Sequence, residues 1–239
     1  MAAGTPELKV LAFDVFGTVV DWRGGVMAEL HFSSPPGEGR VGATAGAFAD
    51  AWRRRAQQLW ASVYRGETPY VVLDEIHAQA LGHVAAEFEL QPLSDAERER
   101  LVLAWHHLPA WPDAVAGMTR LRNRYVLTTL SNGGMAHLVD VGRSARLPFD
   151  CILSTELVKT YKPDPRVYRM VPELLQVRPE QAMMVASHPY DLSAAAKEGM
   201  RTAFVKRPKE WGTGKIEAPD FSVDVTVEDF NDLASQLSA

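Results

Sequence analysis

The chain has 239 residues, of which 46% are hydrophobic and 23% charged, and its formal net charge at pH 7 is −5. This length can bury a sizeable core, either as one large domain or as a domain with an insertion. The negative charge disfavours nucleic acid as a partner, because proteins that bind phosphates usually present a basic surface. The composition is that of a soluble globular protein.

Cys151 is the single cysteine, which excludes an internal disulfide and fits a reducing compartment. The N-terminal residues are too polar for a signal peptide, and the chain contains no apolar run near the roughly 18 residues of a membrane span. We therefore expect a cytoplasmic protein without a membrane partner. A homodimer is the expected assembly only because it is the commonest one.

The first predicted element is a strand at residues 8–13 (LKVLAF), which is apolar enough to be covered on both faces. From about residue 22 to residue 108 the pattern is helical instead. Residues 94–108 open with a capping box formed by Ser94 and Glu97. A short strand at residues 70–73 is the one exception considered. Helical spacings of 3, 4, 7 and 8 relate Phe48, Trp52, Leu59, Trp60, Val63 and Tyr64, and residues 73–88 repeat the pattern.

After Pro112 helices and strands alternate, which predicts parallel strands joined by right-handed crossovers. The predicted fold is α/β, with a Rossmann-like parallel sheet core from residues 1–20 plus 111–239 and an inserted helical cap from residues 21–110. Residues 207–220 are predicted to form a surface loop. The expected helices are 112–123, 133–143, 165–176, 191–199 and 226–237, and the expected strands are 125–130, 151–155, 182–187 and 202–205.

Polar residues follow four of the predicted strands. Because ligands bind at the carboxyl ends of strands in open parallel sheets, these residues are expected to share one site. Each has an ordinary alternative when taken alone, such as capping a turn, opening a helix or standing in solvent. Their coincidence at one edge favours a shared site. The residues are Asp14, Ser131, Asn132, Lys162, Ser187, His188 and Asp191.

Four segments, "FDVFGT", "TLSNGG", "YKPDPRVY" and "VASHPYD", resemble in order the motifs of the haloacid dehalogenase-like hydrolase superfamily. Within it they are similar to the L-2-haloacid dehalogenases (type II). The resemblance covers nearly the whole chain, including an insertion of the length of the family's helical cap. It implies hydrolysis of a small 2-haloacid, a haloacetate or an L-2-haloalkanoate, to the 2-hydroxy acid and halide through an aspartyl ester. No cofactor is implied.

The resemblance also implies residue roles. Asp14 would attack the halogen-bearing carbon, and Thr18 would hydrogen-bond Asp14 and fix its rotamer. Lys162 would keep Asp14 ionised and, with Ser131, hold the substrate carboxylate. Asn132 would donate a hydrogen bond to the leaving halide.

The cap is implied to contribute an arginine to the halide site. Neighbours on a helix point about 100° apart, so the three arginines of residues 53–55 cannot all face one pocket. Arg53 matches the family's halide-binding arginine, and the other two are expected on a solvated face. Tyr168 matches a tyrosine that lines the site, and Phe16 and Trp22 are expected to wall it.

The segment that would activate water departs from the family pattern, because His188 stands where an asparagine is common. Asp191 matches the acid that orients the hydrolytic water, and Ser187 is expected to contact the substrate. One hypothesis gives His188 a share of the general-base role, since an imidazole titrates near neutral pH. The alternative is that His188 only hydrogen-bonds Asp191 or its loop, and the sequence leaves both open.

Phe16 decides between two chemistries of the superfamily. Phosphatases carry a second aspartate at this position, which protonates the leaving oxygen, and they hold Mg²⁺. Phe16 can do neither, whereas a halide leaves without a proton. No metal site is expected, and His106 and His107 are assigned to a helix end whose dipole favours positive charge. The alternatives are a Mg²⁺-dependent phosphatase acting on a small phosphate ester and a non-catalytic binding protein on this fold.

Overall fold

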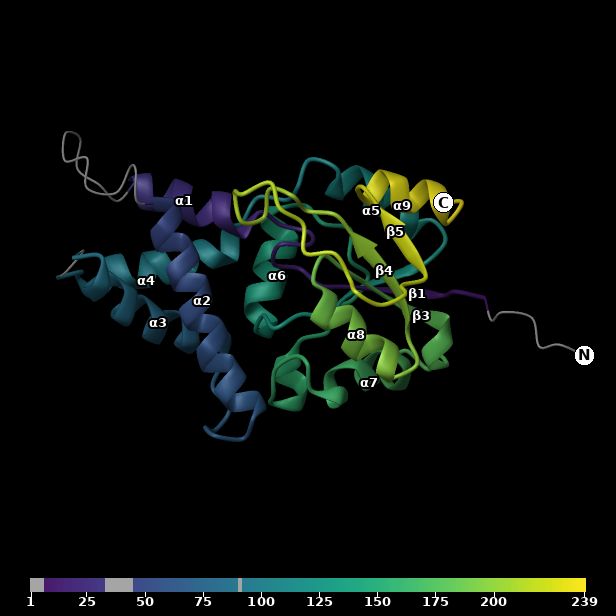
Figure 1. Cartoon of the computed structure of the whole chain (residues 1–239), viewed down its shortest axis with the longest axis horizontal. Coiled ribbons are helices and arrows are strands. Elements are labelled where there is room, and N and C mark those ends of the chain that lie inside the picture. The colour runs from purple at the N-terminus through teal and green to yellow at the C-terminus, as the bar shows by residue number, and fades with distance from the viewer. Residues whose placement is uncertain (1–6, 33–44, 90–91) are drawn as a thin grey trace, which may run out of the picture.

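One five-stranded parallel sheet forms the centre of the structure (Figure 1). The structure is a computed structural model in which residues 7–32, 45–89 and 92–239 are described. The strand order is β2-β1-β3-β4-β5, so β1 is hydrogen-bonded on both sides. All four pairings are parallel. The strands are β1 (Val10–Phe13), β2 (Val126–Thr129), β3 (Ala182–Ala186), β4 (Arg201–Val205) and β5 (Val225–Val227).

Alternate residues of β1 face opposite sides of the sheet, and each side has its own hydrophobic core. Leu11 and Phe13 belong to a core that also includes residues of α5, α6 and α9. Val10 and Ala12 belong to a second core with residues of α7 and α8. The predicted α/β fold is confirmed. The helices are α5 (Ala114–Arg122), α6 (Met135–Ser144), α7 (Pro165–Leu174), α8 (Pro189–Lys197) and α9 (Phe230–Gln236), with short 3₁₀ helices η2 (Thr155–Val158) and η3 (Pro179–Gln181).

A second layer, built in the described residues from helices and their connections, lies beside the sheet domain and forms the left part of Figure 1. Its fourth helix opens with the predicted capping box of Ser94 and Glu97. Residues 70–72 precede α3 without forming a strand, so the short strand considered there was wrong. The elements are α1 (Trp22–Phe32), α2 (Ala45–Tyr64), α3 (Leu73–Glu87), α4 (Asp95–Leu103) and the 3₁₀ helix η1 (Ala104–His107).

The chain enters and leaves this helical layer at one point. Val20 and Ala110 form an antiparallel bridge. Asp21 N donates to the Pro109 carbonyl at 2.8 Å, and Trp111 N donates to the Val19 carbonyl at 3.0 Å. These contacts support the cap boundaries 21–110, with residues 1–20 and 111–239 as the core, which we retain as a proposal.

Two predictions from the sequence were wrong in detail. Residues 151–155, expected to be a strand, make only isolated β-bridges. The reason is that the Thr129 hydroxyl, and not a backbone group, exchanges hydrogen bonds with the backbone N–H and carbonyl of Leu153. The first two residues of the expected closing helix 226–237 belong to strand β5, and α9 begins only at Phe230. Asp229 caps that helix by accepting a hydrogen bond from Asp232 N at 2.8 Å.

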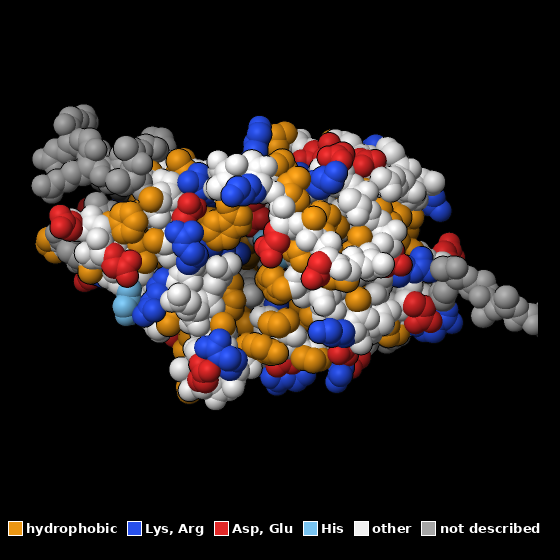
Figure 2. Space-filling model, viewed as in Figure 1, with side chains coloured by type: hydrophobic (Ala, Val, Ile, Leu, Met, Phe, Trp, Pro, Cys, Tyr) orange, Lys and Arg blue, Asp and Glu red, His pale blue; other side chains and the backbone are white. Residues whose placement is uncertain are grey.

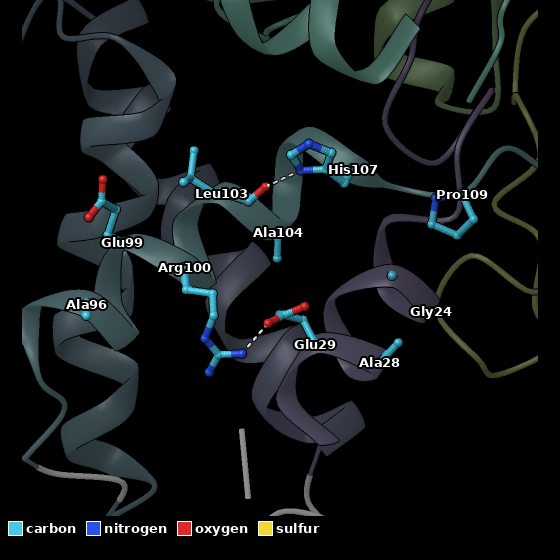
Figure 3. A pocket seen from close by; sticks show the side chains of 11 residues that line it. Gly24, Ala28, Glu29, Ala96, Glu99, Arg100, Leu103, Ala104, His107 and Pro109 are labelled. Atoms are coloured by element: carbon cyan, nitrogen blue, oxygen red, sulfur yellow. Dashed lines mark hydrogen bonds and ion pairs between the residues drawn. The ribbon is translucent and has the colours of Figure 1, made fainter. Parts of the chain in front are cut away.

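Acidic and basic side chains are interspersed over the face in Figure 2. Among the described residues there is no helix that combines the length and the apolar character of a membrane span. A cavity of about 590 Å³ lies on the cap between α1 and α4. The ion pair of Arg100 with Glu29 crosses one side of this cavity (Figure 3).

Candidate active site

Asp14 stands at the carboxyl end of β1 with both carboxylate oxygens hydrogen-bonded. Its backbone N–H bonds the Val185 carbonyl of β3 at 3.0 Å, which fixes its position at the sheet edge. Oδ1 accepts from Lys162 Nζ at 3.2 Å. Oδ2 accepts from the Thr18 hydroxyl at 2.9 Å and lies 3.0 Å from His188 Nδ1. The predicted nucleophile is therefore a buried carboxylate with three polar partners.

A tight turn brings Thr18 back onto Asp14. Gly17 adopts φ 93°, in the left-handed region that favours glycine. The Thr18 hydroxyl gives its proton to Asp14 and accepts from the Ser187 N–H at 3.0 Å. Since that proton is already committed, Ser187 Oγ is the donor in its 3.0 Å contact with Thr18 Oγ1. Ser187 therefore contacts Thr18, the residue that hydrogen-bonds Asp14.

Asp14 is held ionised. Burial by itself raises the pKa of its carboxyl, but the Lys162 charge and the hydrogen bonds from His188 and Thr18 outweigh burial and lower that pKa well below its usual range. A carboxylate nucleophile must be deprotonated to attack, and this environment meets that requirement.

Lys162 lies between two carboxylates. Its ammonium is 3.2 Å from Asp14 Oδ1 and 2.5 Å from Asp191 Oδ2, and the residue is 2% exposed. The Tyr168 hydroxyl donates to Asp191 Oδ1 at 2.7 Å. Burial, together with the nearby Asp14 charge, raises the pKa of Asp191, against the lowering effect of Lys162. A carboxylate with a raised pKa is a better proton acceptor, which suits a general base.

His188 is bracketed by two carboxylates. Its Nδ1 lies 3.0 Å from Asp14 Oδ2, and its Nε2 lies 2.9 Å from Glu210 Oε1. Burial alone would lower the pKa of His188, but the charge of Glu210 and the contacts with Asp14 raise it to about 10. Trp22 Nε1 also donates to Glu210 Oε1, at 3.2 Å. At neutral pH the imidazole is therefore a cation that donates to both carboxylates.

Glu210 is the functional candidate that the sequence did not reveal. It lies in residues 207–220, which were predicted to be surface loop, yet it is 5% exposed. Burial raises the pKa of its carboxyl, but the His188 charge and the hydrogen bonds from His188 and Trp22 lower it overall. A lone glutamate in an irregular segment has no periodic pattern that would predict its burial.

Arg53 reaches the same region from α2 and is surrounded by aromatic rings. Its guanidinium carbon lies 4.9–5.7 Å from four ring centroids, which are distances typical of cation–π contacts. The residue is 7% exposed, and Nε has no hydrogen-bond partner. No carboxylate of the described residues lies within ion-pair distance of it, although the charges of Asp14 and Glu210 act on it. The four rings belong to Phe16, Trp22, Trp60 and Trp105.

Two polar residues after β2 complete the arrangement. Asn132 uses its side-chain oxygen to accept from Lys162 N at 2.9 Å, which ties the loop after β2 to the lysine. Ser131 is fully buried, and its hydroxyl has no partner. Hydrogen bonds thus connect eight of the predicted residues around Asp14 and Lys162, Arg53 acts on them through long-range charge and lies over Phe16, and the Ser131 side chain makes no hydrogen bond to them. All eleven predicted residues except half-buried His188 are buried; they are Asp14, Phe16, Thr18, Arg53, Ser131, Asn132, Lys162, Tyr168, Ser187, His188 and Asp191.

The superfamily's phosphatases use Mg²⁺, and this site does not fit that ion. The Phe16 ring packs edge-on against His137 and below Arg53, where it offers no metal ligand. Oδ2 of Asp14 is already bonded to Thr18 and to protonated His188, whose charge would repel a divalent cation.

A parallel sheet with a buried aspartate at the end of β1 and a helical cap defines a class of hydrolases. The chain matches the family model described as haloacid dehalogenase-like hydrolase over residues 8–199, and it belongs to that family.

Individual relatives and a solved structure show to which members of the family the chain is similar. (S)-2-haloacid dehalogenase 1 from Pseudomonas sp. (strain CBS-3) is 30% identical over 211 residues, which are 85% of this chain and 88% of the relative. Haloacetate dehalogenase H-2 from Moraxella sp. (strain B) is 26% identical and covers 92% of this chain and 95% of its own. A crystal structure of an L-2-haloacid dehalogenase superimposes with a TM-score of 0.89 at 37% identity, covering 97% of this chain and 99% of its own.

Proposed function

We propose that this protein hydrolyses the carbon–halogen bond of small 2-haloacids, a haloacetate or an L-2-haloalkanoate, to the 2-hydroxy acid and halide. The observation that carries the proposal is a buried, ionised carboxylate, Asp14, whose charge acts on a buried arginine without a carboxylate partner, Arg53. The dehalogenase activities of its relatives support it.

In the first step an Asp14 oxygen attacks the halogen-bearing carbon in line. The new carbon–oxygen bond forms as the carbon–halogen bond breaks, and the halide leaves with the bonding electron pair. Arg53 and the Asn132 amide are the proposed halide partners, while Lys162 and the unpartnered Ser131 hydroxyl hold the substrate carboxylate. Near-attack positioning of this kind supplies on the order of 7–11 kcal/mol of barrier reduction.

The two oxygens of Asp14 have different surroundings, and this assigns them different roles. Oδ2 has two donors, Thr18 and His188, whereas Oδ1 has Lys162. In the ester, the oxygen that stays a carbonyl must carry negative charge when water adds to the carboxyl carbon. Oδ2 is the better equipped to carry that charge, so Oδ1 is the oxygen that attacks.

In the second step water attacks the carboxyl carbon of the ester, and Asp191 takes the water's proton. The raised pKa of Asp191 supports this role. When the tetrahedral intermediate collapses, the bond to the alkoxide oxygen breaks, the alkoxide takes the proton from Asp191 and leaves as the 2-hydroxy acid, and Asp14 returns to its carboxylate form as the second water proton is released to solvent. Tyr168 holds Asp191 in place through its hydroxyl.

His188 acts as a cationic donor in this scheme. Because its pKa is about 10 in the free site, it has no lone pair with which to accept a proton from water at neutral pH. A base role would require His188 to lose its proton after the ester has removed the negative charge of Asp14. Glu210 keeps the imidazole charged and oriented throughout.

The decisive experiment measures halide release from chloroacetate, fluoroacetate and 2-chloropropionate in the presence of a chelator. The wild type should release halide and the Asp14→Asn variant should not, while circular dichroism shows that both are folded at the assay temperature. Activity that survives this substitution would overturn the mechanism. If halide release required Mg²⁺, and no other divalent ion could replace it, phosphatase-type chemistry would be favoured instead.

We also propose a cytoplasmic location, no nucleic-acid partner and a homodimeric state. The single cysteine and the net charge of −5 support the first two. The dimer rests only on its frequency among soluble oligomers, and light scattering of the purified chain tests it.

A further inference from the structure

A cluster of histidine and aspartate side chains joins the cap to the core away from Asp14. Asp74 comes from α3 and His106 from η1, both in the cap, while His137 comes from α6 in the core. Asp74 Oδ1 lies 3.3 Å from His106 Nε2 and 3.5 Å from His137 Nδ1. One ligand atom from each residue falls within 4.8 Å of the other two. We call these three residues the cap–core cluster.

The hydrogen bonds on the far side of each ring fix which nitrogen is bare. His137 Nε2 lies 2.7 Å from the Trp105 carbonyl, so it must carry a proton and donate it. His106 Nδ1 lies 2.8 Å from Asp140 Oδ2 and likewise donates. In the neutral rings His137 Nδ1 and His106 Nε2 are therefore bare lone pairs that face the Asp74 carboxylate. With both rings neutral, the Asp74 oxygen and the two ring nitrogens that face it are all hydrogen-bond acceptors, so none of them can donate to another.

Protons alone do not resolve this arrangement. At 3.3 and 3.5 Å the contacts of Asp74 with His106 and His137 lack good hydrogen-bond geometry, and His137 and His106 are 0% and 4% exposed. A proton on His106 would face Asp74 but would leave His137 Nδ1 without a partner. Protonating both rings would place two imidazolium ions face to face, because the rings stack with centroids 4.3 Å apart and planes 2° apart. A single cation at the centre satisfies all three atoms.

We propose that the cap–core cluster binds one divalent transition-metal ion, with Zn²⁺ as the best match. Two imidazole nitrogens and one carboxylate oxygen are ligands that Zn²⁺ prefers, at about 2.0–2.2 Å. The three atoms must draw together from their present separations, and the parallel rings must tilt toward each other. The charges of Asp74 and Asp140 balance that of the ion.

The surroundings have the features of a metal site. Both ring N–H groups are held by oxygen acceptors, the arrangement that orients metal-binding histidines. The Asp74 side chain is 41% exposed although its Oδ1 is buried, so the cluster lies just below the surface on the Asp74 side. The Phe16 ring packs against His137, so an apolar wall separates this ion from the Asp14 region. The ion would fasten the cap to the core rather than take part in bond cleavage.

The test uses the full-length protein after treatment with a chelator, titrated with Co²⁺ and then with Zn²⁺. Wild type should bind one Co²⁺ with the visible absorption of a tetrahedral site, Zn²⁺ should displace it, and Zn²⁺ should raise the unfolding temperature. His137→Gln should abolish the Co²⁺ signal. Asp140→Asn, which changes only the residue that orients His106, should weaken Co²⁺ binding about 10–100-fold.

His107→Gln is the matched control, because His107 is an exposed neighbour whose Nδ1 contacts only the Leu103 carbonyl. It should bind Co²⁺ as wild type does. If wild type shows no Co²⁺ absorption, or if His137→Gln binds as tightly as His107→Gln, the metal site does not exist. Both readouts are independent of halide release, so they can fail while the proposed dehalogenase activity stands.

Discussion

His188 Nδ1 lies 3.0 Å from Asp14 Oδ2, on the carboxylate oxygen that Lys162 does not contact. The Asp14 carboxylate is therefore held between two cations, one on each oxygen. The same imidazole reaches Glu210 on its other side, so a buried chain of alternating charge runs from Asp14 through His188 to Glu210.

A single turnover in ¹⁸O water tests the aspartyl ester directly. With enzyme in excess over substrate, water adds to the carboxyl carbon of Asp14, so the label should appear in Asp14 and the 2-hydroxy acid should contain none. Mass spectrometry of the peptide containing Asp14 and of the product checks both. Label in the product after one turnover would mean that water attacks the substrate carbon directly.

Replacing His188 with asparagine removes the positive charge beside Oδ2 of Asp14 but leaves an amide that can still donate a hydrogen bond. We expect kcat to fall by less than about 100-fold, the loss typical of removing one donor to an oxyanion altogether. The wild-type pH–rate profile should fall at high pH with an apparent pKa near 10, because His188 then loses its proton. That fall should vanish in His188→Asn. If it persists, another group causes it.

The same variant should show a pH-dependent loss of stability. The pKa of His188 rises from 6.5 in the unfolded chain to about 10 in the folded one. The contribution of protonated His188 to the free energy of unfolding is therefore fully present below pH 6.5 and is lost as the pH rises through about 10. The free energy of unfolding should drop by about 3 kcal/mol in His188→Asn near neutral pH. Urea unfolding of both proteins should show this gap closing toward pH 10.

Neutralising Glu210 should shift the titration of His188 without removing it. In Glu210→Gln one of the two charges that hold the proton on the imidazole is lost, so the basic fall in the pH–rate profile should move to lower pH. Glu217→Gln, an exposed glutamate of the same loop, is the matched control. An unshifted profile in Glu210→Gln would show that Glu210 does not set the charge of His188.

Arg53 should be needed for activity and not for stability. Arg53→Met keeps an apolar side chain among the aromatic rings but removes the anion partner, so kcat/KM should fall at least about 100-fold. Removing a buried charge that has no carboxylate partner should not lower the unfolding temperature. Arg54→Met alters the exposed neighbour and should leave both unchanged. A large drop in the unfolding temperature of Arg53→Met would instead assign Arg53 a structural role.

The residues at the strand ends could be predicted from sequence because topology alone brings them together. Asp14, Lys162 and Asp191 lie far apart in the chain, yet each follows a segment that ends at one edge of the sheet. The resemblance chose Arg53 among three neighbouring arginines, and Arg53 is buried while Arg54 is exposed as expected. Arg55, also expected on a solvated face, is only half-exposed.

The contacts that the sequence missed depend on packing between elements without a shared pattern. Trp105 comes from the 3₁₀ helix η1, and no local spacing relates it to Arg53, whereas Trp60 lies seven residues after Arg53 in the same helix. Glu210 is buried by its partners His188 and Trp22, which lie in other segments. The pairing of His106 with His137 likewise exists only once cap and core are packed together.

The bridge between Val20 and Ala110 brings the two ends of the helical insertion side by side. Replacing the insertion as one unit would therefore need only this one junction and would leave the sheet that carries Asp14 intact. Arg53 and most of the aromatic rings around it lie in the insertion, whereas Lys162 and Asp191 lie in the sheet domain. Under the proposed mechanism, selection or engineering could change leaving-group recognition in the insertion while the proposed ester-forming residues stay constant.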